Sequence, residues 1–128
     1  MRCLDATFVI DHLAGETAAV ERMAAWTAAG ERLAVPSPVV AEVLLGSYYK
    51  GGAALREALG FLDTLDALPL DGATAAEAGR MGAEQRRRGV ASSLADLLIA
   101  ATSKLNQGIL VTRDQGFGQV PGLSVETY

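Results

Sequence analysis

The sequence predicts an α/β protein, a three-layer α/β/α sandwich around a mainly parallel sheet of four or five strands. Short apolar segments alternate with longer helical stretches, which is the pattern of strand–helix–strand units. Alanine, the best helix former, fills 23 of the 128 positions. Half of the residues are hydrophobic, so the chain can build a core, and its length fits a single domain spanning residues 1–128.

Five brief apolar or β-branched runs are predicted as strands. Because helices separate them, we expect the strands to lie mostly parallel, with helices on both faces of the sheet. Such a sheet binds ligands at the carboxyl ends of its strands. The predicted strands are residues 1–4, 33–35, 67–70, 109–112 and 124–126.

The predicted helices are bounded by capping residues and glycines. Ser37 and Pro38 are expected to open the second long helix, and Ser92 with Ser93 to cap the last one. The predicted long helices are residues 16–29, 37–49, 53–65, 73–88 and 94–106, after a first short helix that carries His12.

Composition narrows the class of protein. A net charge of −4 argues against a general nucleic-acid coat, but not against an enzyme that touches nucleic acid at one site. The single cysteine, Cys3, cannot form an internal disulfide; we expect it to be buried and inert in a reducing, cytoplasmic setting. No apolar run approaches the roughly 20 residues that span a bilayer, and no signal peptide is apparent.

Four acidic residues stand in unusual places. Asp5 follows the first strand and Asp114 the fourth, whereas Glu42 and Asp96 are each the only charge in an apolar helix. We expect helices this apolar to pack against the sheet nearly all round. A charge on such a helix needs a cation, strong donors or a polar crevice, because unpaired burial is very costly.

The topology should bring these four acids to one pocket at the carboxyl edge of the sheet. At about 6 Å and an effective dielectric of about 20, each pair of carboxylates repels by roughly 3 kcal/mol. Either some are protonated or a divalent cation lies among them, and oxygen ligands favour Mg²⁺ or Mn²⁺ over zinc. Taken alone, each acid also fits a cap, a turn or an ion pair, but their joint placement favours a metal site.

Four segments of this chain, in order and with family spacing, resemble the motifs of PIN-domain ribonucleases. Within that family the chain is most similar to the VapC toxins of bacterial toxin–antitoxin pairs. The resemblance covers the whole chain and is specific only when the four motifs are taken together. The segments are residues 4–11, 36–46, 96–102 and 110–123.

The resemblance implies a PIN-like fold and a Mg²⁺- or Mn²⁺-dependent endoribonuclease. It also implies a homodimer that a small VapB-like antitoxin holds inactive. By position, Asp5 and Asp96 match the best-established metal ligands, Glu42 and Asp114 match the third and fourth acids, and Thr7 and Thr112 match supporting polar residues.

One departure from the family pattern concerns the fourth acid. Many relatives carry a further Asp where this chain has Gly116. The fourth acidic position of the site therefore depends on Asp114 alone, which argues against a tightly held second metal. Asp11 recurs in the opening motif, but we expect it to be structural because it lies one helical turn beyond the pocket.

For catalysis, the hypothesis is that Asp5 and Asp96 anchor the metal and that Glu42 or Asp114 orients the attacking water. Water would then leave a 5′-phosphate without using the RNA 2′-hydroxyl. The lone histidine, His12, excludes a ribonuclease built on a histidine pair.

Several residues have two open interpretations. The run Arg86, Arg87 and Arg88 could be a solvated helix end or an RNA contact, and Arg113 is a second RNA candidate. Trp26, Tyr48 and Tyr49 could stack on bases or pack against a partner. By analogy with the family, residues 39–45 and 53–65 offer a groove for an antitoxin.

Two other functions remain as alternatives. A catalytically weak PIN-like binding module would act through a partner, and only Gly116 favours it. A haloacid-dehalogenase-like phosphotransfer enzyme would use Asp5 as the nucleophile. It would need a second Asp where Thr7 stands, and a lysine that the chain does not supply at the required place.

Overall fold

The computed structural model describes all 128 residues and contains a five-stranded parallel sheet with the strand order β3-β2-β1-β4-β5. β1 lies at the centre and pairs with β2 on one side and with β4 on the other. The predicted parallel sheet is confirmed in its five-stranded form. The strands are β1 (Arg2–Leu4), β2 (Leu33–Pro36), β3 (Asp66–Leu68), β4 (Ile109–Val111) and β5 (Ser124–Glu126).

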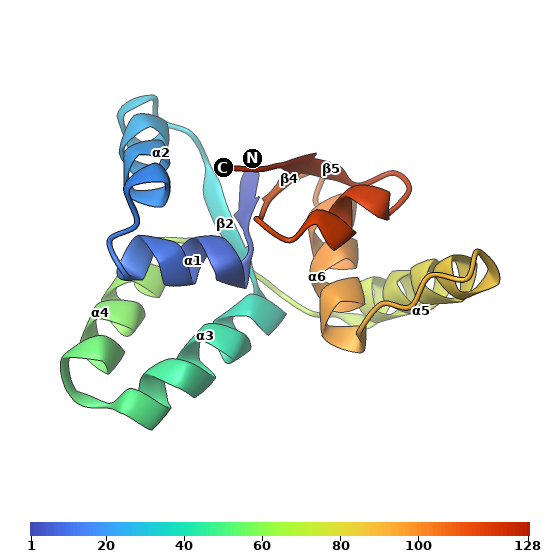
Figure 1. The fold of residues 1–128 in the computed structure, drawn as a ribbon, viewed down its shortest axis with the longest axis horizontal. Coiled ribbons are helices and arrows are strands. Elements are labelled where there is room, and N and C mark those ends of the chain that lie inside the picture. Colours follow the sequence, from blue (N-terminus) through green and yellow to red (C-terminus); the bar gives the residue numbers. More distant parts are fainter.

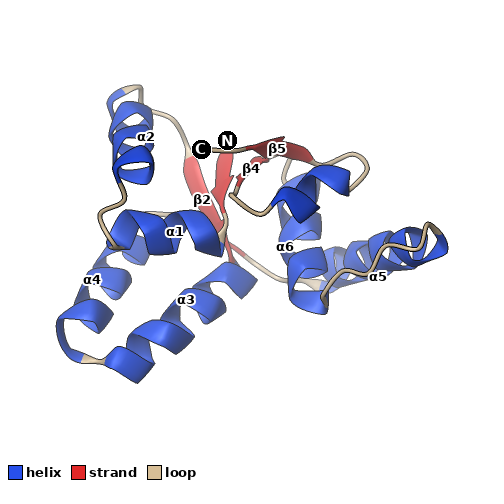
Figure 2. Ribbon diagram, viewed as in Figure 1, coloured by secondary structure: helices blue, strands red, loops and turns tan.

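Six α-helices cover the sheet and complete the predicted three layers. In Figure 1, α1, α2 and α4 lie to the left of the strands, α3 runs below them toward the lower left, and α5 and α6 lie to the right; Figure 2 shows the strands between these two groups of helices. This follows from right-handed crossovers that run outward from β1 to β3 and then back from β3 to β4. The helices are α1 (Ala6–Leu13), α2 (Thr17–Ala28), α3 (Ser37–Lys50), α4 (Gly52–Asp63), α5 (Gly72–Arg87) and α6 (Leu94–Leu105), followed by the short 3-10 helix η1 (Gln115–Gln119).

The two predicted serine caps have different outcomes. Ser93 caps α6 as predicted, because its side chain accepts a hydrogen bond from the backbone N–H of Asp96 at 3.1 Å. Ser37 does not cap α3, because Pro36 holds the N-cap position. The Ser37 hydroxyl instead donates to the Leu68 carbonyl at 2.6 Å, which ties the start of α3 to β3.

The expectation that both apolar helices pack nearly all round is right only for the middle of α6, residues 97–103, and is wrong for α3. α6 buries six of its twelve residues. α3 buries only Val39 and Val43 and leaves Leu45, Tyr48 and Tyr49 exposed. Figure 1 shows the reason: α3 and α4 form a hairpin that extends away from the sheet, so the last turns of α3 have no strand beneath them.

The core is one cluster of 24 buried hydrophobic residues. Phe8 is fully buried and packs on Trp26 with ring centroids 5.3 Å apart, so Trp26 belongs to the core and is not free to stack on bases. Cys3 is buried as predicted, and burial raises the pKa of its thiol. None of the helices combines the length and the apolar character that crossing a membrane requires.

Gly108, which leads into β4, is expected to tolerate no side chain. A Cβ there would overlap Cys3 Sγ and stand 3.2 Å from Met1 Cε. Gly108→Ala should therefore lower the free energy of unfolding, measured in urea, by about 1–3 kcal/mol. The control is Gly79→Ala on α5, where the new methyl meets nothing within 4 Å. That change should stabilise the protein by about 0.5–1 kcal/mol, and a Gly108→Ala protein as stable as the wild type would contradict the packing argument.

Candidate active site

The carboxyl ends of β1 and β4 meet at the point where the order of strands reverses. From β1 the chain moves toward β2 and β3, whereas β4 and β5 lie on the other side of β1. The crevice at such a switch point is where open α/β sheets bind ligands. Asp5 directly follows β1, and Asp114 lies in the turn of residues 112–114 that follows β4. The two acids predicted to follow these strands therefore flank the crevice.

Asp5 is buried, at 4% exposure, and held by two threonines. Its Oδ2 accepts hydrogen bonds from Thr112 Oγ1 at 2.6 Å and from Thr7 Oγ1 at 3.3 Å. The Asp5 backbone N–H donates to the Val111 carbonyl at 3.0 Å, which extends the pairing of β1 with β4. The two residues predicted to support the pocket therefore both fix the Asp5 carboxylate, through the same oxygen.

Asp96 lies in the first turn of α6, and α6 leads into β4, so this turn lies at the same edge of the sheet. Partial burial raises the pKa of the Asp96 carboxyl. The hydrogen bond with Ser93 opposes that shift, whereas the negative charges of Asp114 and Asp5 add to it. Asp96 is thus within electrostatic range of both acids that flank the crevice.

Glu42 lies on the second turn of α3 and is exposed at the surface. Partial burial of its carboxylate raises the pKa, and the negative charges of Asp5 and Asp96 raise it further. Its side chain lines a separate cavity of about 240 Å³ between α1, α3 and α4. The charges of Asp5 and Asp96 therefore act on Glu42, but Glu42 does not line the cavity of Asp96 and Asp114.

Asp114 shares a cavity of about 280 Å³ with Asp96. Its Oδ1 accepts a hydrogen bond from the backbone N–H of Gly116 at 2.9 Å and so caps η1. A Cβ on Gly116 would lie 3.1 Å from that oxygen, closer than a relaxed contact. Glycine at this position thus leaves room for the Asp114 side chain to fold back over the turn.

The structure brings the four acids to one edge of the sheet without closing them into a ligand set. Across the whole chain, no three Asp, Glu, His or Cys side chains stand close enough together to hold a metal ion. The single pocket expected from the sequence is divided, because Asp96 and Asp114 line one cavity and Glu42 lines another. The donor chemistry fits a hard divalent cation, since these groups offer only oxygen. Burial is the main cause of the raised pKa values of Glu42 and Asp96, and repulsion by the neighbouring acids, which a cation would offset, adds to it.

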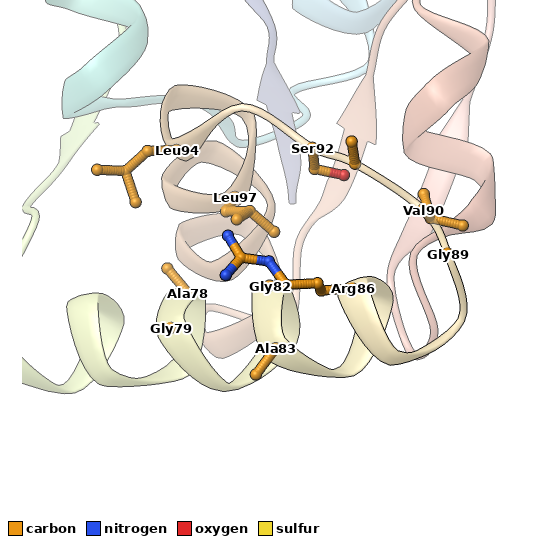
Figure 3. A pocket seen from close by; sticks show the side chains of 11 residues that line it. Ala78, Gly79, Gly82, Ala83, Arg86, Gly89, Val90, Ser92, Leu94 and Leu97 are labelled. Carbon is orange, nitrogen blue, oxygen red and sulfur yellow. The ribbon is translucent and has the colours of Figure 1, made fainter.

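A larger groove adjoins the cavity of Asp96 and Asp114. It has a volume of about 530 Å³, lies between α5 and α6, and shares residues 90–92 and Leu97 with that cavity. Figure 3 shows the Arg86 side chain extending over this groove, above small residues of α5 such as Gly82. A groove with a basic side chain thus continues from the acidic cavity.

The four arginines predicted to contact RNA fall into two groups. Arg86, Arg87 and Arg88 are exposed at the end of α5 and form no ion pair within the chain. Arg113 instead pairs with Asp11 of α1, with Nε 2.9 Å from Oδ2. Sequence reasoning overlooked Tyr128, whose hydroxyl donates to the same oxygen at 2.6 Å. Its only signal was its place just after the strand that pairs with β4.

The fold and these sequence motifs agree with a match to a known family. The family model of the PIN domain matches residues 2–123. The chain belongs to the PIN domain family. This match confirms the resemblance to the PIN domain that the four sequence motifs indicated. No curated protein matches the chain.

Three solved structures of VapBC proteins contain a chain that resembles this PIN domain in fold. VapBC2 from Rickettsia felis, bound to a DNA fragment from its promoter, is 21% identical with a TM-score of 0.86, over 99% of this chain and 98% of that chain. DNA-bound VapBC from Salmonella typhimurium is 24% identical with a TM-score of 0.83, over 98% and 96%. VapBC-5 from Mycobacterium tuberculosis, a member of the VapBC family of toxin–antitoxin systems, is 23% identical with a TM-score of 0.68, over 98% and 94%.

Glu42→Gln is expected to stabilise the metal-free PIN domain at neutral pH. A raised pKa in the fold means that ionisation of Glu42 costs stability above that pKa, and this cost disappears as the pH falls toward the ordinary value of 4.5. Because the side chain is largely exposed, solvent screening limits the gain to about 1 kcal/mol or less. Urea unfolding in EDTA, near neutral pH and again near the ordinary pKa, measures the difference. A gain that did not shrink on acidification would contradict this assignment.

Proposed function

We propose that this chain is the toxin of a type II toxin–antitoxin pair and acts as a Mg²⁺- or Mn²⁺-dependent endoribonuclease. The observation that carries the proposal is the set of acids at the switch point of a PIN-domain sheet, next to a groove with a basic side chain. Toxin–antitoxin relatives with the same fold support it. The proposed catalytic acids are Asp5, Glu42, Asp96 and Asp114.

Each acid is assigned a role that its surroundings support. Asp5 and Asp96 hold the cation, because Asp5 is fixed by two hydroxyls and the backbone of Asp96 is fixed by the Ser93 cap. A bound divalent cation lowers the pKa of water and neutralises phosphate charge. Glu42 or Asp114 orients the attacking water. Thr112 keeps the Asp5 carboxylate in place by donating to it.

Binding of the RNA backbone requires positive charge. Because the net charge of this chain is −4, that positive charge must come from a local group of basic side chains. The end of α5 supplies it, since Arg86, Arg87 and Arg88 are exposed and Arg86 lies over the groove next to the acidic cavity. Guanidinium groups bind phosphate oxygens in a fork geometry. We therefore place the RNA strand across the four acids, with its phosphate backbone along the end of α5.

Partner binding is assigned to the surface of α1, α3 and α4. Ile10 lines the 240 Å³ cavity beside Glu42, and further large hydrophobic side chains of α3 and α4 are exposed. Exposed apolar surface of this kind marks interaction sites. We place a small VapB-like antitoxin there, with a basic side chain reaching the acids in competition with metal. A homodimer and a cytoplasmic location are part of the same proposal. The exposed side chains are Ile10, Leu45, Tyr48, Tyr49 and Leu59.

Cleavage of RNA by the purified chain, freed of any partner, tests the activity. The wild type should cut total cellular RNA with Mg²⁺ or Mn²⁺ and not with EDTA. Asp5→Asn and Asp96→Asn should each lower the rate by at least about 100-fold, because each removes charge where the cation must be held. Glu77→Gln, which breaks an ion-pair cluster between α5 and α6, serves as the folded control. A folded wild type that binds metal but cuts no RNA would favour the binding-module alternative.

The chemistry of the product ends tests the role of water. Hydrolysis by water activated among these acids leaves a 5′-phosphate and a 3′-hydroxyl, and it does not require the RNA 2′-hydroxyl. Ligation of an adaptor that requires a 5′-phosphate should therefore succeed on the fragments without prior kinase treatment. Fragments ending in a 2′,3′-cyclic phosphate would rule out this mechanism.

The arginines of α5 are tested by the salt dependence of RNA binding. Neutralising all three, as Arg86→Gln, Arg87→Gln and Arg88→Gln together, should reduce the slope of log affinity against log salt by about 2, since each lost phosphate contact removes about 0.7 for a single strand. Fluorescence anisotropy of a short RNA in EDTA measures binding without cleavage. Arg56→Gln on exposed α4 is the matched control and should leave the slope unchanged. An unchanged slope in the triple variant would mean that these side chains are only a solvated helix end.

A further inference from the structure

A buried carboxylate outside the four acids has all its partners within the fold. Asp11 of α1 is 7% exposed. Its Oδ1 accepts a hydrogen bond from Arg113 Nη2 at 3.0 Å, and its Oδ2 lies 2.9 Å from Arg113 Nε and accepts from the Tyr128 hydroxyl at 2.6 Å. This two-point contact with a guanidinium is the geometry that fixes an arginine most firmly. A buried charge needs such partners, because removing one of them leaves the other uncompensated.

Tyr128 completes this arrangement from the segment after β5. Its ring packs edge-on against buried Phe8 at 5.0 Å, and the Arg113 guanidinium lies 5.9 Å from its ring centroid. Burial and the Asp11 carboxylate raise the pKa of Tyr128 to about 12. The phenol therefore keeps its proton at neutral pH and acts as a donor. We name the three residues Asp11, Arg113 and Tyr128 the α1–β5 clamp.

The clamp acts on the turn that carries two functional groups. Arg113 stands between Thr112, which donates to Asp5, and Asp114, which lines the acidic cavity. The backbone N–H of Arg113 donates to Thr7 Oγ1 at 3.2 Å, and that of Asp114 donates to Thr112 Oγ1 at 3.0 Å. The turn after β4 is thus held by its backbone on one side and by the Arg113 side chain on the other.

We propose that Asp11 and Tyr128 are positioning residues: by fixing the Arg113 side chain, they set the turn that presents Thr112 to Asp5 and Asp114 to the cavity. Arg113 then serves the site through the protein and not as a contact to RNA. The catalytic consequence rests on the proposed ribonuclease function, whereas the effect on the turn does not.

The decisive variant is Tyr128→Phe, which removes one hydroxyl and keeps the ring on Phe8. A hydrogen bond to a charged group is typically the stronger kind, so its loss should raise amide hydrogen exchange at Arg113 and Asp114 by about tenfold. Amides in the middle of α6 should not change. Unchanged exchange at these two amides in Tyr128→Phe would overturn the proposal, whether or not the protein cuts RNA.

Kinetics separate positioning from RNA binding. In Tyr128→Phe and Asp11→Asn, kcat for a short RNA should fall by roughly 10-fold to 100-fold, as expected for a displaced functional group, with KM unchanged within twofold. Arg113→Lys should show the same loss, because a lysine keeps the charge but not the fork. If Arg113 were an RNA contact restrained by Asp11, freeing it in Asp11→Asn would lower KM and leave kcat intact, which would overturn the assignment.

Two further measurements keep the result interpretable. Glu77→Gln removes a carboxylate that also holds two basic partners, Arg80 and Lys104, but touches no residue of the turn, so it should change neither kcat nor exchange at residues 113 and 114. Mn²⁺ affinity, followed by the electron paramagnetic resonance of free Mn²⁺, should weaken in Tyr128→Phe and not in Glu77→Gln. A wild type that binds Mn²⁺ but cuts no RNA would count against the proposed function alone, since exchange and affinity still decide the role of the clamp.

Discussion

The hydrogen bond from Thr112 to the buried Asp5 carboxylate, 2.6 Å long, is the contact on which the rest of the crevice depends. A carboxylate at 4% exposure is tolerated only when strong donors face it. That requirement holds the ends of β1 and β4 in register, and Thr112 in turn accepts the amide of Asp114. One side-chain pair thereby links the register of the sheet, the turn out of β4 and the position of the fourth acid.

The features that the sequence could predict follow from local pattern and topology. Alternating strands and helices require a parallel sheet, and in a parallel sheet the residues that follow β1 and β4 must share an edge. Asp5 and Asp114 could therefore be placed together without coordinates. The cap of α6 was equally local, because Ser93 stands three residues before the amide that it satisfies.

The features that the sequence could not predict depend on contacts between distant residues. Ser37 looks like a cap, yet its hydroxyl binds the carbonyl of Leu68, 31 residues away. Glu42 looks buried on an apolar helix, yet it is exposed, whereas the next residue, Val43, lies on the buried side of α3. The partners of Asp11 lie 102 and 117 residues along the chain, a separation at which no periodicity indicates a contact. For these residues, the tertiary packing determines the hydrogen-bond partners and the exposure, which local sequence propensity does not specify.

The chain separation within the crevice has a consequence during synthesis. Thr112 and Asp5 are 107 residues apart, and Tyr128 and Asp11 are 117 apart, so the edge of the sheet cannot form while β4 and β5 are untranslated. A growing copy emerges from the ribosome with Asp5, Thr7 and Glu42 already made but without Thr112, the donor closest to the Asp5 carboxylate. On the proposed function, such a chain cannot attack the messenger or ribosome that is producing it. On that function the site is incomplete until translation is almost finished, and a premature stop before β4 yields a fragment that lacks both Thr112 and Asp114.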